Sequence, residues 1–296
     1  MNNDVITIAE GKLYQLPNPY ELNGYVTSHP ADATGWAPMN CYLLVENGRA
    51  LLIDSGYSVA EKSVLRQLSS LIDTETPIEF FPTGLGEFNV VCNAKAITEN
   101  FNVVKYYGLL DGAHAWMDFR PDQGRYGTPI AQGAISKVQN AVAHSHDILE
   151  WSHGPRQLQV FQSNLRLLPC HWSYDEETGT LFTADCFTHL SRETAQGPWT
   201  VVPGETPPTL EDTYYYYVNS RFWWLPGANT EELEQELIEL FGRLDVRAIA
   251  PRWGCAMIGE EAVNIHYELL LDVLRKARED EPTGVTAGAI PMGGRA

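Results

Sequence analysis

The segment His144-Ser145-His146-Asp147 imitates the start of a metal-binding H-x-H-x-D motif. Imidazole nitrogens and carboxylate oxygens are common ligands of Zn²⁺ and Fe²⁺ in proteins. The segment lies, however, in a stretch without clear periodicity, just before a β-rich run that begins at Gln157. We therefore predict a polar surface turn here rather than a metal site. Four further histidines lack ligand-like spacing and are expected to be surface or packing residues, namely His114, His153, His189 and His266.

The five cysteines are another potential source of chemistry. They are scattered, odd in number and contain no C-x-x-C pair, which favours reduced thiols in a cytoplasm. The chain begins without the basic start and apolar core of a signal peptide, and no apolar run approaches the length of a membrane span. We therefore expect a cytoplasmic protein.

The formal charge of the 296-residue chain is −18, from 38 acidic and 20 basic residues. Such a surface repels nucleic acid and anionic membranes, so neither is an expected partner. Strong negative charge can also serve solubility alone. With 44% hydrophobic residues the chain can form a substantial packed core.

The first half of the chain alternates strands and helices. Residues 41–54 read CYLLVENGRALLID, in which Asn47-Gly48 favours a tight hairpin turn. Apolar residues at helical spacing follow over 58–73, then a strand over 78–82, a helix over 90–100 and a strand over 103–107. This order is typical of an α/β protein.

The second half repeats this alternation. LQVFQSNLRLLPCHW and TLFTADCF are β-rich, residues 229–244 and 263–277 form amphipathic helical patterns, and 247–251 is a short strand. We predict an α/β sandwich of two sheets covered by helices, as a single domain over 1–280 with similar halves at about 1–150 and 151–280. Residues 281–296 are expected to be a flexible tail, and 111–155 have no clear assignment.

A dense aromatic run precedes the first of these helices. It comprises Tyr214–Tyr217, Phe222, Trp223 and Trp224. Alternation in the run indicates a strand with one inward face. Core or dimer packing is the simplest role, and an aromatic-lined ligand pocket is the alternative.

Two segments resemble the metallo-β-lactamase superfamily. NCYLLVENGRALLIDSG is similar to that family's entry hairpin, and the next strand ends in Thr83-Gly84-Leu85-Gly86-Glu87-Phe88-Asn89. The family has T-H-x-H-x-D-H there, whose histidines and aspartate bind two metals. Aligned on the threonine, the ligand positions hold Gly84, Gly86, Phe88 and Asn89.

Further along, LLPCHWSYDEETGTLFTADCF is similar to the histidine segment and metal-bridging aspartate of the flavodiiron branch. His171 and Asp185 match those two ligands, and Trp253 stands where the final histidine is expected in Ala250-Pro251-Arg252-Trp253-Gly254. The resemblance spans roughly residues 40–274 and implies the αββα four-layer sandwich of the family.

The resemblance also implies that the metal site is degenerate. A bound Zn²⁺ or Fe²⁺ needs about three or four protein donors, and glycine, phenylalanine and tryptophan provide none. We therefore expect no metal cofactor. The alternative is a single Zn or Fe ion on His171, Asp185 and Glu87.

Arg252 could supply the positive charge that Asp185 has lost, because a buried carboxylate needs a partner. The alternative is a solvent-facing Arg252. In the implied fold Cys170, Cys186 and Cys255 also lie near the former metal pocket. They are expected to pack as small apolar residues, with a thiol nucleophile, redox role or soft-metal ligand as the alternative.

These residues favour a divergent binding or partner module, or an enzyme whose chemistry needs no metal. The pocket candidates are His171, Asp185, Cys170, Cys186, Arg252 and Trp253. The alternative is a metal-dependent hydrolase or a di-iron-like oxidoreductase with an atypical site at His171 and Asp185. Expected partners are a small organic ligand in the former metal pocket, a second copy of the chain, or a redox partner protein that carries any flavin.

Overall fold

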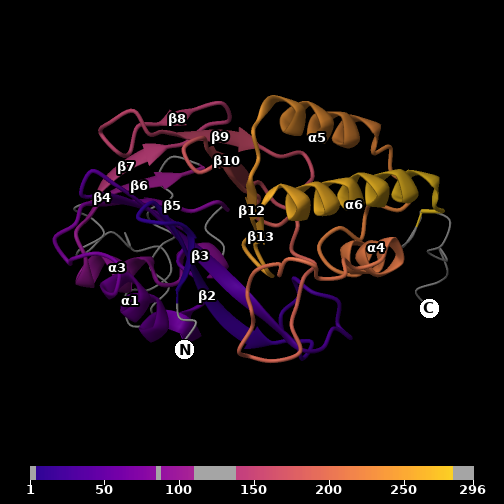
Figure 1. Ribbon diagram of the computed structural model, residues 1–296, viewed down its shortest axis with the longest axis horizontal. Helices are drawn as coiled ribbons and strands as arrows, with labels where there is room; N and C mark the ends of the chain where they lie inside the picture. Colours follow the sequence, from indigo (N-terminus) through magenta and orange to yellow (C-terminus); the bar gives the residue numbers. More distant parts are fainter. Residues whose placement is uncertain (1–4, 85–87, 110–137, 283–296) are drawn as a thin grey trace, which may run out of the picture.

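The computed structural model describes residues 5–84, 88–109 and 138–282, which fold around two β-sheets (Figure 1). The tail beyond residue 282, Glu87, and most of the segment that had no clear sequence assignment lie outside the described residues. Within the described part of the chain, no helix is both long enough and apolar enough to cross a membrane.

The first sheet contains seven strands in sequence order. The strands are β1 (Ile6–Ala9), β2 (Leu13–Glu21), β3 (Trp36–Glu46), β4 (Arg49–Ile53), β5 (Ile78–Phe81), β6 (Val103–Gly108) and β7 (Gln139–Val142). The predicted hairpin forms β3 and β4, and Asn47 and Gly48 take φ angles of 50° and 70° in its turn. Strands β4 to β7 run parallel, so their carboxyl ends lie at one edge of the sheet.

The second sheet has six strands in the order β13-β12-β11-β10-β9-β8. They are β8 (Ile148–Leu149), β9 (Leu158–Gln162), β10 (His171–Asp175), β11 (Thr180–Phe182), β12 (Ala248–Ala250) and β13 (Met257–Ile258). Strands β11 and β12 are parallel, and the other neighbours in this sheet are antiparallel. Residues 144–147 form the expected polar turn, in which the His144 amide donates to Asp147.

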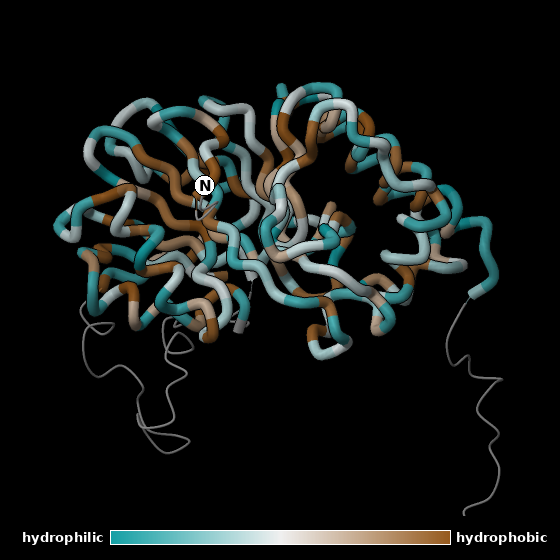
Figure 2. Tube along the Cα trace, turned by 60° about the horizontal axis from the view of Figure 1, so that its bottom comes forward, coloured by the Kyte–Doolittle hydropathy of each residue, from teal (hydrophilic) through white to brown (hydrophobic). Residues whose placement is uncertain are grey.

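Helices cover the outer face of each sheet (Figure 1). The first sheet carries η1 (Ser58–Ala60), α1 (Glu61–Ser69), α2 (Phe88–Val91) and α3 (Ala94–Asn100), and the second carries α4 (Leu210–Val218), α5 (Glu231–Arg243) and α6 (Glu260–Glu279). Three apolar clusters fill the spaces between successive layers, one under each set of helices and one between the sheets. Figure 2 shows hydrophobic stretches along the strands and hydrophilic segments at the periphery. The predicted αββα sandwich is therefore confirmed.

The aromatic run at Tyr214–Tyr217 is helical, so the predicted strand was wrong. Thr209 begins α4 as its N-cap, because its side chain accepts from the Asp212 amide. Burial follows the helical spacing, because Thr213 and Tyr217, four residues apart, are buried while Tyr215 is 47% exposed. Tertiary packing against α6 overrides the strand preference of consecutive tyrosines.

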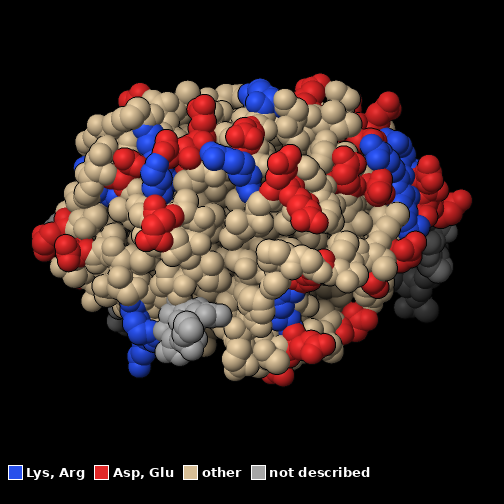
Figure 3. Space-filling model, viewed as in Figure 1, with Lys and Arg blue, Asp and Glu red and all other residues tan. Residues whose placement is uncertain are grey.

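Acidic side chains spread over the face seen in Figure 3, with fewer lysines and arginines between them. The helix α5 accounts for part of this charge, because Glu231, Glu232 and Glu234 stand in its first turn. Negative side chains at this end of a helix interact favourably with the exposed backbone N–H groups. The N-cap of α5 is Thr230, so the helix begins two residues after the predicted start at 229, and the Asn229 side chain accepts from the Glu231 amide.

Candidate functional site

Four strand ends meet where the two sheets face each other. Asp54 follows β4 and Thr83 lies just after its parallel neighbour β5. Asp185 follows β11, and Arg252 follows the parallel strand β12. Ligands in α/β proteins commonly bind beyond the carboxyl ends of parallel strands. This edge is therefore the natural position for a functional site.

The Arg252 side chain lies at the centre of this edge and is fully buried. Its Nη1 donates to Asp185 Oδ1 at 2.6 Å, and its Nε donates to Asp54 Oδ2 at 3.2 Å. Its Nη2 donates to Thr83 Oγ1 at 2.6 Å. The expected proximity of Arg252 and Asp185 is thus present, and the guanidinium also joins the two sheets. We call these four residues the Arg252 cluster.

Backbone contacts hold Arg252 in this position. Its amide donates to Ala184 O at 2.9 Å, and its carbonyl accepts from the Asn40 amide at 2.7 Å. The Asn40 side chain donates to the carbonyls of Pro251 and Gly254, both at 2.9 Å. Gly254 has φ +80°, and a Cβ there would lie 2.8 Å from Leu190 O, so the turn requires glycine.

Asp54 is a buried carboxylate with a strained backbone, at φ 59°. It accepts from the Thr83 amide at 2.7 Å and from the Thr83 hydroxyl. Burial raises the pKa of Asp54 to about 6, and the opposing effects of Arg252 and of the Thr83 hydrogen bonds only partly offset that rise. The protonation state of the cluster therefore changes in mildly acidic solution.

Asp185 has a second cationic neighbour, which the sequence did not suggest. Arg221 Nε lies 3.0 Å from Asp185 Oδ2. The guanidinium carbons of Arg221 and Arg252 lie 5.0 Å and 5.3 Å from the Trp253 ring centroid. Two arginines thus balance the two carboxylates while sharing one indole. In the sequence, Arg221 is distinguished only as the one charged residue in the segment VNSRFWW.

His171 is joined to this cluster through its backbone, because its amide donates to Thr83 O at 2.8 Å. It begins β10 and pairs with Gln162 of β9, and its ring stacks on Phe81 with centroids 6.3 Å apart. Burial lowers the pKa of His171 to about 4. The loop before β10 places Leu167 and Leu168, rather than His171, among the described residues that line the pocket beside Trp253. His171 is the first residue of β10, so its backbone is part of the ladder between β10 and β9.

The three predicted pocket cysteines are buried in the apolar cluster beneath α4, α5 and α6. The Cys186 thiol donates to Leu165 O at 3.3 Å. Burial raises the pKa of Cys186 well above its usual value and that of Cys255 to about 12. Protonated, buried thiols are poor nucleophiles, so these contacts favour packing.

The positions that match the family's other metal ligands are partly described. Gly84 forms an isolated bridge with Cys170, while Asn89 and Trp253 line the pocket. Phe88 begins α2, and Gly86 and Glu87 lie outside the described residues. No group of three or more His, Cys, Asp or Glu side chains within the described part of the chain is placed to hold a metal ion. Both carboxylate oxygens of Asp185 face arginines, so the described donors do not fit a di-iron centre.

Comparison with known proteins finds solved structures that are similar to this chain but no match by sequence. No protein-family model and no curated protein matches the sequence. The rubredoxin oxygen:oxidoreductase of the anaerobe Desulfovibrio gigas has a similar structure, with a TM-score of 0.67, 15% identity, and coverage of 94% of this chain and 62% of that chain.

Other flavodiiron structures agree. The flavodiiron protein of Giardia intestinalis matches with a TM-score of 0.64, 13% identity, and coverage of 91% of this chain and 59% of that one. A 1–254 fragment of putative diflavin flavoprotein A 5 from Nostoc matches with a TM-score of 0.62, 14% identity, and coverage of 93% and 96%. This chain therefore spans less than two thirds of the first two proteins. Its fold is the metallo-β-lactamase fold, in the form that flavodiiron proteins have.

Proposed function

We propose that this chain is a metal-independent binding protein built on a flavodiiron-like fold. The observation that carries the proposal is the position of Arg252, whose Nη1 lies 2.6 Å from Asp185 Oδ1. Asp185 matches the residue that bridges two metals in the family that the sequence resembles. Here its charge is neutralised by side chains of the same chain.

The energetics of burial support this proposal. A buried carboxylate that loses its partner costs several kcal/mol, and the same holds for a buried guanidinium. A cation bound at Asp185 would have to displace Arg252 from both Asp185 and Asp54. The chain would then hold an arginine that is fully buried and has lost two ion pairs. Without a metal ion, Arg252 keeps its ion pairs with both Asp54 and Asp185.

The alternative, a hydrolase or di-iron-like oxidoreductase with a single ion on His171 and Asp185, draws its support from the fold likeness. Its proposed ligands have other contacts: His171 stacks on Phe81, and Asp185 faces two arginines. We therefore favour the binding function.

Metal analysis combined with thermal unfolding tests the proposal. The full chain, purified from cells grown with added iron and zinc, is expected to contain iron, zinc and manganese only far below one equivalent. Dialysis against a chelator is expected to leave Tm unchanged, because no folded-state metal is lost. One tightly held equivalent that disappears in His171→Ala, with a chelator-dependent Tm in the original chain, would overturn the proposal.

A further inference from the structure

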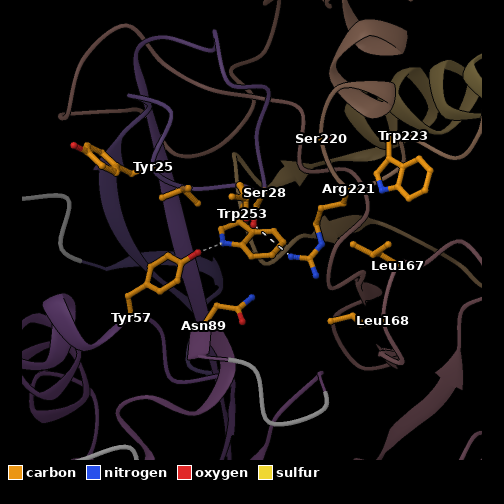
Figure 4. A pocket seen from close by; sticks show the side chains of 12 residues that line it. Tyr25, Ser28, Tyr57, Asn89, Leu167, Leu168, Ser220, Arg221, Trp223 and Trp253 are labelled. Carbon is orange, nitrogen blue, oxygen red and sulfur yellow. Dashed lines mark hydrogen bonds between the residues drawn. The ribbon is translucent and has the colours of Figure 1, made fainter. Parts of the chain in front are cut away.

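A pocket of ≈ 670 Å³ lies beside the Arg252 cluster (Figure 4). Its walls come from the segment after β2, from α2, from the loop before β10, and from the segments after α4 and β12. Arg221 is the one charged residue among the described side chains that line it. In a chain of formal charge −18, a pocket whose charged wall is an arginine selects anions over cations.

Asn89 gives this pocket a buried hydrogen-bond donor. The residue is 5% exposed and lines the pocket, and its Nδ2 has no hydrogen-bond partner among the described residues. Figure 4 shows the amide below Trp253, with its nitrogen on the side of that indole. A buried N–H group without an acceptor is destabilising, so a ligand oxygen at this point would be stabilising.

Arg221 provides a second donor. Its Nη1 donates to Ser28 Oγ at 3.4 Å, its Nε faces Asp185, and its side chain is 13% exposed. A guanidinium presents five N–H donors in a planar fork, which suits a carboxylate. The Trp253 indole beneath it is fixed by a hydrogen bond to Tyr57 Oη at 3.3 Å.

One part of the pocket wall is apolar and exposed. Trp223 is 56% exposed, and Leu167 and Leu168 are 43% and 45% exposed. Exposed apolar side chains that gather at a pocket are typical of a ligand site. These three side chains can cover one face of a flat ring.

We propose that this pocket binds a small organic carboxylate with a planar apolar body. The carboxylate accepts from Arg221 and from Asn89, and the apolar body lies against the exposed side chains of Trp223, Leu167 and Leu168. This assignment rests on the proposed metal-independent function, because it leaves the Arg252 cluster intact behind the pocket.

Titration calorimetry on the full chain in the presence of a chelator tests the ligand class. The probes are benzoate, phenylacetate and 2-naphthoate, each paired with its neutral amide, and inorganic phosphate. At least one acid is expected to bind with 1:1 stoichiometry and about tenfold more tightly than its amide, because a charged acceptor strengthens the hydrogen bonds from both donors. Phosphate is expected not to displace it. Equal affinities for acid and amide, displacement by phosphate, or the absence of binding by every acid would overturn the assignment.

Two substitutions locate the site. Arg221→Gln and Asn89→Asp are each expected to weaken acid binding by about tenfold or more, the second because it places a like charge beside the ligand. The amides are expected to change far less. Arg243→Gln is the matched control, since Arg243 lies over Phe161 at a separate pocket. An unchanged acid affinity in both pocket variants, with Tm showing that they fold, would contradict the assignment.

The outcome separates this assignment from the proposed function. Acid binding that occurs only after iron or zinc is added would contradict metal independence. Chelator-treated protein that is folded and metal-free but binds none of the acids would contradict the ligand class alone.

Discussion

One guanidinium contacts two buried carboxylates of the Arg252 cluster, one from each half of the chain. Arg252 joins Asp54 after β4 to Asp185 after β11. Its Nη2 also donates to the Thr83 hydroxyl. Such an arrangement is stable only while every charge keeps its partner. The cluster is therefore sensitive to single substitutions in a way that surface ion pairs are not.

Arg252→Met is expected to lower the free energy of unfolding by about 3–5 kcal/mol, because Asp54 loses its buried cation and Asp185 keeps only Arg221. Urea unfolding measures the change. Asp54→Asn in the same chain is expected to restore part of the loss, since it removes the carboxylate whose ion pair with Arg252 is broken.

Arg247→Met is the control for this substitution. Arg247 is half-exposed and its ion pair with Asp245 is at the surface, so a change below about 1 kcal/mol is expected. Equal losses in the two variants would contradict the structural role of Arg252.

Asp54 gives a pH dependence whose sign follows from its raised pKa. The folded chain holds the Asp54 proton up to about pH 6, whereas the ordinary value is 3.8. The carboxyl therefore contributes stability at low pH that is lost as pH rises through this window. Relative to Asp54→Asn, the unfolding free energy of the original chain is expected to fall by roughly 2 kcal/mol between pH 4 and pH 7. A rise over the same range would show that Arg252 outweighs burial.

Individual residues were predicted with mixed success. The proximity of Arg252 to Asp185 followed from the need of a buried carboxylate for a cation. The contribution of Arg221 did not, because it comes from the segment after α4, and no local pattern reveals that this segment returns to the strand ends.

At the scale of elements, the tyrosines of α4 contact the loop that bears Asp185. The Tyr217 hydroxyl accepts from the Phe187 amide at 2.9 Å, two residues beyond Asp185. The Tyr216 hydroxyl lies 2.9 Å from Thr188 Oγ1. The helix thus supports the loop with side chains that a strand would have pointed elsewhere.

Tyr217→Phe is expected to lower the free energy of unfolding by about 1–2 kcal/mol, because it leaves a buried backbone N–H without its acceptor. Tyr215→Phe, on the exposed side of the same helix, removes a bond to Asp32 and is expected to change stability much less. Thermal and denaturant unfolding of the two variants provide the comparison, and a larger loss for Tyr215→Phe would contradict the helix placement.

Most elements were predictable because their apolar spacing matches their burial. The hairpin of β3 and β4, the strands β5 and β6, and the helices α5 and α6 all follow from local pattern. The run at α4 did not, because four adjacent tyrosines have no helical period. The Thr209 N-cap and the packing against α6 favour the helix.

At the scale of the whole molecule, buried histidines lie in both halves of the sandwich. Burial lowers the pKa of His29, His171 and His266 to about 4. In each case the unfolded chain binds the proton first, so stability present above pH 6.5 is lost as pH falls toward 4. Their effect opposes that of Asp54.

His171→Phe tests this effect, since phenylalanine can keep the stacking on Phe81. The Tm of the variant is expected to fall less than that of the original chain between pH 6.5 and pH 4, because one buried proton acceptor has been removed. Parallel curves from differential scanning calorimetry would contradict the lowered pKa.

The most direct measurement is a crystal structure of the full chain with anomalous scattering, from crystals grown with Fe²⁺ and Zn²⁺. We expect the Arg252 guanidinium between Asp54 and Asp185, with no anomalous peak at the Asp185 carboxylate. A pair of peaks roughly 4 Å apart and bridged by Asp185, with Arg252 turned away, would contradict the metal-independent site.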